Sequence, residues 1–295
     1  KGLTSLISRA FTDLTKKENT KKTPSKFGLF KNKTANKNCF VLDFHGDIKA
    51  TEVQQLREEI STLLTVAQAE DEVIVRLESS GGMVHAYGLA AAQLARIKEA
   101  GLNLTVCIDK VAASGGYMMA CVADKILAAP FAVVGSIGVV AQVPNFHDLL
   151  EKHDIDVEVF TAGKYKRTVT VFGENTEEDK QKFQQELEET HKLFKDFVRK
   201  YRPSLDVEQV ATGEHWYGED AITRNLVDAL QTSDSYILEK MTDSELYAIQ
   251  SRQKPTIAQK LGISQAALAV VATAIDKLPD TLAKLESAKM PMVKK

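Results

Sequence analysis

The chain has 295 residues and an ordinary globular composition, with 44% hydrophobic and 26% charged residues. Such a chain can bury one large core or two modest ones, which excludes a protein that is disordered throughout. The formal net charge of -2 gives no reason to expect nucleic acid as a partner. The three cysteines form no CxxC pair and lie in apolar surroundings, so we expect core thiols rather than a disulfide or a metal site.

Residues 1–38 are strongly basic, with nine lysines and Arg9 opposed only by Asp13 and Glu18. The segment has little apolar periodicity, so we predict a mobile tail. A solvated linker and an attachment to an anionic membrane surface are both compatible with this composition. Because the chain begins at Lys1 rather than at Met, we expect an upstream membrane anchor and a location at the plasma (inner) membrane, on a side that the sequence leaves open.

Strand-like and helix-like segments alternate after the tail. Apolar runs predict strands, and apolar residues at helical spacing predict helices. In chain order these are strand 39–44, helix 51–67, strand 72–77, helix 84–100 and strand 102–108, then short strands at 124–128, 133–140 and 156–160 with a helix near 145–152. This alternation favours an α/β fold with right-handed crossovers and a largely parallel sheet.

A long amphipathic helix is predicted from Thr176 to Tyr201, where Asn175 and Glu178 resemble a capping box. Its aromatic face exceeds what one core is expected to cover, which favours a homo-oligomer. This face consists of Phe183, Phe194, Phe197 and Tyr201.

Two glycine-rich turns follow predicted strands and suggest chemistry. Ser114 lies between small residues and glycines, where a strand-like run changes to a helix-like one, so we interpret it as a nucleophile. The alternative is a helix N-cap serine. The Gly81-Gly82 turn also ends a strand, and ligands of parallel sheets bind at such ends. Amides of Gly81, Gly82 and Gly115 could hold an oxyanion without interference from side chains.

The base that would activate the serine is left open by the residues alone. His85, His147 and His215 are available, but no motif fixes any of them near Ser114. A lysine can do the same work where burial lowers its pKa.

Several ordered motifs resemble the signal peptide peptidase A family of serine proteases, and within it the SohB-like branch. The match runs from about residue 41 to about residue 234. The motifs are Glu78–Gly82, Ala113–Tyr117, Gly135–Val139, Gly163–Lys166 and Ala211–Gly218.

The resemblance implies an α/β, crotonase/Clp-protease-like fold of repeated β-β-α type units with a long C-terminal helical part. It implies a serine endopeptidase with a Ser–Lys dyad, in which Ser114 is the nucleophile and Lys166 the general base. By the same resemblance, Gly81 and Gly115 are oxyanion donors, and Ser136 orients the lysine. We expect no cofactor and no metal, with peptides or membrane-associated protein remnants as substrates.

The resemblance also predicts the domain organisation and the assembly. We expect a basic tail at 1–38, a peptidase domain at 39–253 and a helical tail of unassigned role at 254–295. Relatives form rings, so we expect a ring-like homo-oligomer in which the dyad is completed between subunits. One departure is Ser80, which stands where the family usually has a proline; a freer turn here predicts weakened or unchanged activity.

Three alternatives remain at this point. A Clp-like Ser–His–Asp peptidase would use the same fold, although no histidine follows Ser114 until His147. A crotonase that binds an acyl-CoA would also use it, but enolate chemistry needs no nucleophilic serine. A catalytically silent membrane scaffold could keep the fold for assembly alone.

Overall fold

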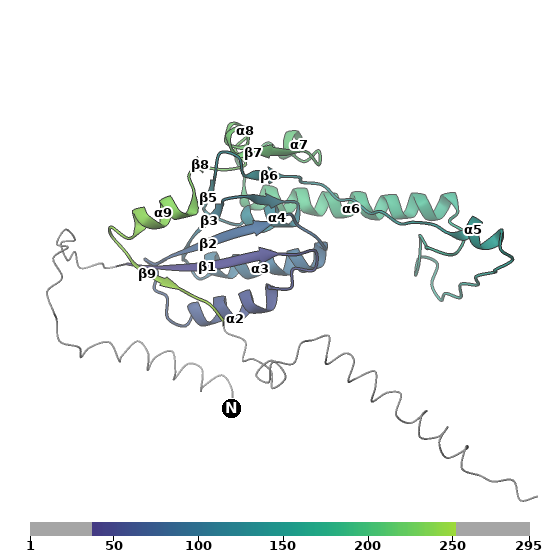
Figure 1. The fold of residues 1–295 in the computed structure, drawn as a ribbon, viewed down its shortest axis with the longest axis horizontal. Coiled ribbons are helices and arrows are strands. Elements are labelled where there is room, and N and C mark those ends of the chain that lie inside the picture. The colour runs from purple at the N-terminus through teal and green to yellow at the C-terminus, as the bar shows by residue number, and fades with distance from the viewer. Residues whose placement is uncertain (1–36, 252–295) are drawn as a thin grey trace, which may run out of the picture. The chain divides into compact units, whose positions relative to one another are not determined.

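The computed structural model describes residues 37–251 (Figure 1). The predicted tails 1–38 and 254–295 therefore lie outside the described residues, apart from Lys37 and Asn38. The strands are β1 (Asn38–Gly46), β2 (Glu72–Ser79), β3 (Asn103–Ile108), β4 (Val111–Ala113), β5 (Lys125–Ala128), β6 (Val133–Gly135), β7 (His215–Tyr217), β8 (Ala229–Leu230) and β9 (Glu245–Ala248). The helices are α2 (Val53–Leu63), α3 (Val84–Glu99), α4 (Gly115–Ala120), α5 (His147–Glu151), α6 (Glu177–Tyr201), α7 (Val207–Val210), α8 (Gly218–Thr223) and α9 (Ser233–Lys240).

Within these residues the strands form a single sheet in the order β7-β6-β4-β2-β3-β5-β8, with β1 pairing both β2 and β9. Every pair is parallel except β6–β7. The parallel pairs follow from the crossovers, because α2 joins β1 to β2 and α3 joins β2 to β3. The predicted α/β class with a largely parallel sheet is confirmed.

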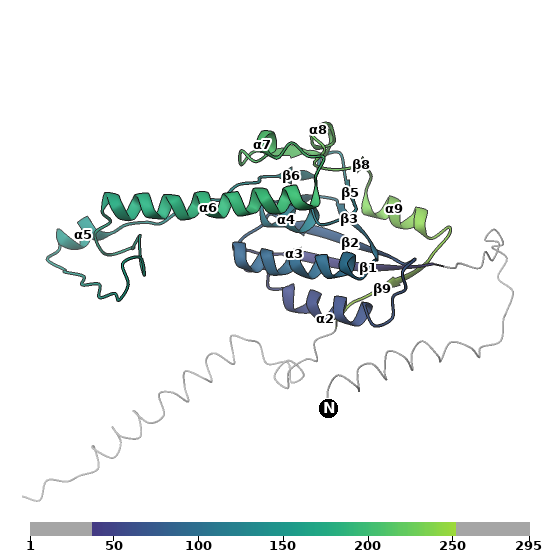
Figure 2. The same cartoon turned by 180° about the vertical axis from the view of Figure 1, so that it is seen from behind.

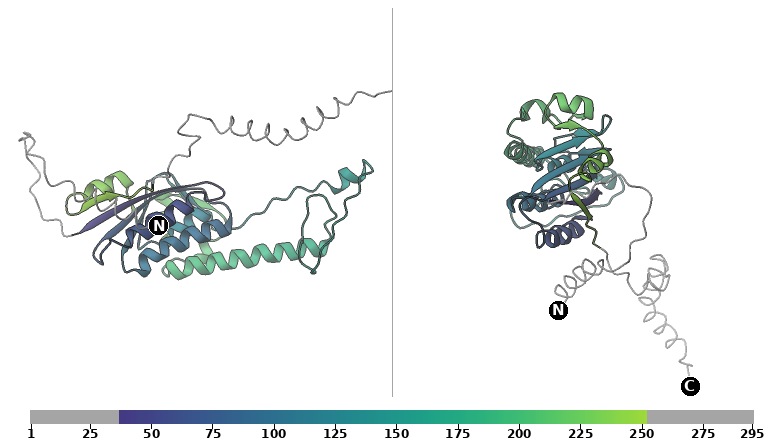
Figure 3. Two further views of the ribbon diagram at one scale, coloured as in Figure 1. Left: turned by 90° about the horizontal axis from the view of Figure 1, so that it is seen from below. Right: turned by 90° about the vertical axis from the view of Figure 1, so that its left-hand side faces the viewer.

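The sheet is covered on both faces, because consecutive residues of β1, β2 and β3 are buried although successive side chains point to opposite faces. Phe40 and Leu42 of β1 face the main core, whereas Cys39 and Val41 face a smaller cluster that includes Tyr236 of α9. The helices α2, α3, α4 and α6 contact one another in that order and form the layer over the main core (Figure 2). Figure 3 shows α9 on the opposite face of the sheet.

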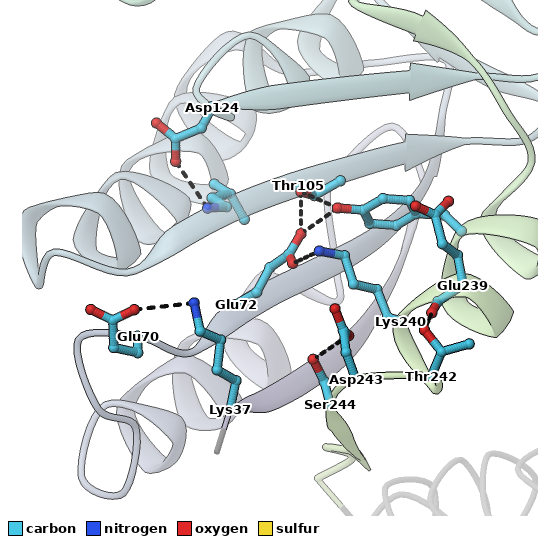
Figure 4. Close-up of polar contacts among 12 residues, drawn as sticks. Lys37, Glu70, Glu72, Thr105, Asp124, Glu239, Lys240, Thr242, Asp243 and Ser244 are labelled. Atoms are coloured by element: carbon cyan, nitrogen blue, oxygen red, sulfur yellow. Dashed lines mark hydrogen bonds and ion pairs between the residues drawn. The ribbon is translucent and has the colours of Figure 1, made fainter. Parts of the chain in front are cut away.

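A polar network fastens α9 to the sheet (Figure 4). The Glu72 carboxylate accepts hydrogen bonds of 2.6 Å from the hydroxyls of Thr105 and Tyr236 and lies 2.6 Å from Nζ of Lys240. Burial acts to raise the pKa of Glu72, but these hydrogen bonds outweigh it and hold the pKa below its ordinary value. The network therefore stabilises the charged carboxylate at neutral pH.

The predicted elements that differ from the structure depended on local pattern alone. The strand expected at 133–140 ends at Gly135, because positive φ angles of 107° at Gly135 and 52° at Ser136 interrupt the extended backbone. Residues 156–160 form no strand; their apolar side chains are exposed, and no strand within residues 37–251 pairs with them. The capping box of α6 lies one residue later than predicted, between Thr176 and Asp179.

Among the described residues, no helix combines the length and the apolar character needed to cross a bilayer.

Candidate active site

Ser114 lies at a sharp turn between β4 and α4. Its φ of 52° and ψ of -120° are uncommon for a residue other than glycine. The conformation is held by a hydrogen bond from the Ser114 amide to the carbonyl oxygen of Gly135, at 2.8 Å, and by another from the Met118 amide to the Ser114 carbonyl, at 2.9 Å. Strained strand-to-helix turns of this kind expose nucleophiles in hydrolases.

The Gly81 turn lies directly against the Ser114 turn. Because Ser79 of β2 pairs with Ala112 of β4, the carboxyl ends of these two strands meet. Gly81 has a φ of 89°, and a Cβ atom there would lie 2.6 Å from the Gly115 amide and 2.8 Å from Cβ of Ser114. Only glycine fits at this position, in both its conformation and its space.

The amide of Gly81 already has an acceptor, since it donates to Oγ of Ser79 at 3.0 Å. This bond argues against the predicted use of Gly81 as an oxyanion donor. Gly82, the next residue, lines the cavity beside Ser114 together with Gly115. Gly81 instead contributes by its lack of a side chain, which lets the two turns approach each other.

An apolar cavity of about 290 Å³ opens beside Ser114. Residues from α3, α4 and the carboxyl-terminal part of α6 form most of its wall, and its size and apolar character suit one apolar side chain of a bound peptide. The lining residues are Gly82, Val84, Gly88, Ser114, Gly115, Met118, Gly138, Val139, Thr190, Leu193, Phe194 and Phe197.

Ser136 is close to the Ser114 turn through the backbone of β6. Ala113 pairs with Gly135, and the neighbouring Ser136 is half-buried with its amide donating to the carbonyl of Glu214 at 2.6 Å. The structure therefore brings Ser114, Gly81, Gly115 and Ser136 together at the carboxyl ends of β2, β4 and β6.

Lys166 lies elsewhere, in a part of the chain that we call the arm, residues 140–189. The remaining described residues are called the body. Figures 1 and 2 show α6 extending away from the sheet, with α5 near its far end. Lys166 is exposed in the loop of the arm, and its amide donates to the carbonyl of Gly163 at 3.1 Å.

The separation of Lys166 from Ser114 follows from the length of α6. Lys164 binds Glu178 near the start of this helix, whereas Thr190 lines the cavity at Ser114. An α-helix rises about 18 Å between positions such as Glu178 and Thr190. Within one chain the structure therefore does not place the predicted nucleophile and the predicted base side by side.

Lys164, the neighbouring candidate base, is held by Glu178 with an Nζ–Oε1 distance of 2.8 Å. Its hydrogen bond to Glu178 raises the pKa of Lys164, which is the opposite of what a general base requires. For Lys166, by contrast, no side-chain partner occurs within residues 37–251.

The histidines that the sequence offered as bases are dispersed. His85 lies in the exposed first turn of α3, His147 lies on α5 in the arm, and His215 starts β7. None of them is hydrogen-bonded to Ser114 in the described part of the chain. His147 with Asp148 and Glu151 is the one group there whose side chains could hold a metal ion, and both of its acids are exposed.

The chain is similar to known proteins over most of its length. The family described as Peptidase family S49 matches residues 96–247, and Peptidase family S49 N-terminal matches residues 4–94. A probable protease SohB of Haemophilus influenzae is 65% identical over 223 residues, which cover 76% of this chain and 63% of that protein. A probable protease SohB of Buchnera aphidicola from Acyrthosiphon pisum is 56% identical over 232 residues, covering 79% of this chain and 69% of that protein. The chain thus spans less than two thirds of the length of the Haemophilus protein.

Among solved structures, a mutant of the 1510-N membrane-bound stomatin-specific protease aligns with 73% of this chain and 99% of that chain, at 11% identity and a TM-score of 0.47. Another mutant of the same protease, in complex with a substrate peptide, aligns with 78% of this chain and 97% of that chain, at 12% identity and a TM-score of 0.45.

Proposed function

The chain belongs to peptidase family S49, and from this premise we propose that it contains the catalytic machinery of a serine endopeptidase with Ser114 as nucleophile and Lys166 as general base. The observation that carries the proposal is the Ser114 turn. It has positive φ, lies against the Gly81 turn and borders an apolar cavity. This combination provides a serine on a strained turn, backbone donors and a place for a substrate side chain.

In the proposed reaction the Ser114 oxygen attacks the scissile carbonyl carbon, and the serine proton passes to the neutral amine of Lys166. Backbone amides of Gly82 and Gly115 stabilise the oxyanion. Lys166 then returns the proton to the departing amine, which leaves Ser114 acylated. Water then attacks the ester and gives a proton to Lys166, which passes it to the Ser114 oxygen as the ester C–O bond breaks and the acid product leaves. The hydroxyl of Ser136 orients the lysine.

The lysine in this proposal comes from a second copy of the chain. The arm exposes apolar side chains that one chain leaves uncovered, including Val140 at 91% and Phe160 at 88% exposure. Exposed apolar surface of this extent is typical of a subunit interface. When a neighbouring copy covers the arm, Lys166 of the first copy could lie beside Ser114 of the neighbouring copy. We therefore propose a closed homo-oligomer.

The cavity supports a substrate class. Its wall is largely apolar and includes Met118, Leu193 and Phe194, so it favours an aliphatic side chain next to the scissile bond. We propose peptides and membrane-associated protein remnants as substrates, and a location at the inner membrane.

The proposal is tested with a fluorogenic peptide that has leucine before the scissile bond and with a fluorophosphonate label. Wild type is expected to hydrolyse the peptide and to be labelled, whereas Ser114→Ala should do neither while keeping its circular dichroism spectrum. A matched peptide with glutamate in place of leucine should be a poor substrate. Hydrolysis that persists in purified Ser114→Ala protein would exclude Ser114 as nucleophile, and a wild type that neither hydrolyses nor labels would favour a silent scaffold.

A further inference from the structure

One buried side chain, Tyr87 of α3, connects the two turns of the proposed site. Its hydroxyl donates to the carbonyl oxygen of Asp47 at 2.7 Å and lies 2.5 Å from Oγ of Ser79. Ser79 in turn accepts the hydrogen bond of the Gly81 amide at 3.0 Å. Tyr87 and Ser79 are 0% and 2% exposed, so water does not compete for these bonds.

The number of hydroxyl protons decides which group donates in the hydrogen bonds of Tyr87 and Ser79. A tyrosine and a serine hydroxyl each carry one proton. Because Tyr87 donates its proton to Asp47, Ser79 must donate to Tyr87. The only other acceptor seen for the Ser79 hydroxyl in the described residues, the carbonyl of Gly46, is 3.5 Å away and at the limit of a hydrogen bond. The result is one chain of donors from the Gly81 amide through both hydroxyls to the Asp47 carbonyl.

The ring of Tyr87 reaches the other turn. A Cβ atom on Gly115 would clash with Cγ of Tyr87, and a Cβ atom on Gly46 would clash with its hydroxyl. Glycine at both positions therefore leaves space for this ring. Tyr87 contacts the Ser114 turn through its ring and fixes the Gly81 turn through its hydroxyl.

The turn after β1 belongs to the same structure. The amide of Met83 donates to the carbonyl of Ile48 at 2.9 Å, and a Cβ atom on Gly82 would clash with that carbonyl. Asp47 is itself fixed, because its carboxylate accepts from the amide of Thr51 at 2.8 Å. The donor chain thus ends on a turn that also contacts Gly82.

We propose that Tyr87 is a positioning residue that holds the Gly81-Gly82 turn in the conformation needed for oxyanion binding. This inference rests on the proposed function and deepens it. The Gly81 turn needs a restraint for two reasons. The φ of Gly81 is 89°, and the preceding residue is Ser80, whose own φ is not fixed as that of a proline would be. Burial raises the pKa of Tyr87, so its phenol remains a proton donor at neutral pH.

Tyr117 provides a matched control. It is also 0% exposed, and its hydroxyl donates to the carbonyl of Leu226 at 2.9 Å. Tyr87→Phe and Tyr117→Phe each remove one buried hydroxyl and keep the ring, so both should lower the melting temperature. Only Tyr87→Phe should lower kcat, by about 10-fold with KM within about twofold, since a displaced oxyanion donor weakens transition-state binding.

Tyr87→Phe, Ser79→Ala and the double variant Ser79→Ala/Tyr87→Phe form a double-mutant cycle, measured on the chain of 295 residues. If the hydroxyls act as one chain, either single change breaks it, so the double variant should lose no more kcat than the more affected single variant. Ser79→Ala also decides the question if Tyr87→Phe does not fold, with the same expected loss of kcat.

Equal kcat in the Tyr87→Phe and Tyr117→Phe variants, or fully multiplicative losses in the double variant, would overturn the role of Tyr87 while leaving the peptidase proposal intact. A wild type without hydrolysis or labelling would overturn both proposals. The two failures are therefore distinguishable in one set of measurements.

Discussion

The body and the arm differ in how their side chains are covered. In the body, the Ser114 turn is surrounded by buried residues on both sides, from Ala112 to Ala113 and from Gly115 to Ala123. In the arm, residues 140–189 include a single buried residue, Gly173, and the arm tip is held by local contacts such as the stacked rings of Phe146 and Phe172. The buried core of the body holds its turns in place, whereas the arm has almost no buried residues to hold its loop.

This difference suggests a division of the proposed reaction. The proposed nucleophile and the turns proposed to bind the oxyanion are positioned within one chain, because β2 and β4 pair there. The proposed base is carried on a surface that needs a partner to become buried. On this view the body determines stability and the arm determines whether the site is complete, and each half of that division can be tested separately.

The largest expected effect is the loss of activity in Lys166→Ala. A missing general base should lower kcat by a factor of about 10³ or more, since the serine then has no acceptor for its proton. The melting temperature should stay unchanged, because Lys166 is exposed in the arm. Initial rates with the leucine peptide and a thermal scan provide both measurements.

Lys164→Ala is the matched control for this experiment. Lys164 is only two residues away and is paired with Glu178, so its loss should leave most of the activity. If Lys164→Ala is the inactive variant and Lys166→Ala remains active, the base has been assigned to the wrong lysine.

A smaller effect is expected from mixing two inactive proteins. After dissociation and reassembly of Ser114→Ala with Lys166→Ala in equal amounts, about one junction in four of a closed ring should join an intact serine to an intact lysine. Activity should therefore recover to about a quarter of the wild-type value per site. Wild type taken through the same procedure controls for losses. A mixture that stays inactive while wild type recovers would place the dyad within one chain.

The sequence predicted the parts of this fold in which local pattern and tertiary structure agree. The segments that became β1, β2 and β3 are apolar runs, those that became α2 and α3 have apolar residues at helical spacing, and the Ser114 turn has its own glycine signature. It did not predict β4, β7, β8 or β9, which have two to four residues each and exist because a neighbouring strand pairs with them.

The details of the site depended even more on distant contacts. The bond from Tyr87 to Asp47 joins residues 40 positions apart, and nothing in the local sequence of α3 distinguishes this tyrosine from an ordinary core residue. The hydrogen bond that occupies the Gly81 amide likewise depends on the direction of the Ser79 side chain. Spacing identified the glycines but could not show which of their amides has an acceptor.

The smallest expected effect concerns the stability of the body at the end of the sheet where β2 begins. Glu72→Gln leaves Lys240 without its carboxylate partner, with side chains only 15% and 26% exposed in the wild type, so the free energy of unfolding should fall by about 2 kcal/mol at neutral pH. The folded-state pKa of Glu72 lies below its ordinary value of 4.5, so the carboxylate contributes stability above that pH and loses it as the pH falls through the folded-state value. The difference between wild type and Glu72→Gln in urea unfolding should therefore be full at pH 7 and shrink below about pH 4.5.

Glu70→Gln is the control, because Glu70 pairs with Lys37 at 76% and 57% exposure and its loss should cost at most about 0.5 kcal/mol (Figure 4). Equal losses in the two variants, or a difference that does not change with pH, would show that the Glu72 network does not stabilise the body through its charge.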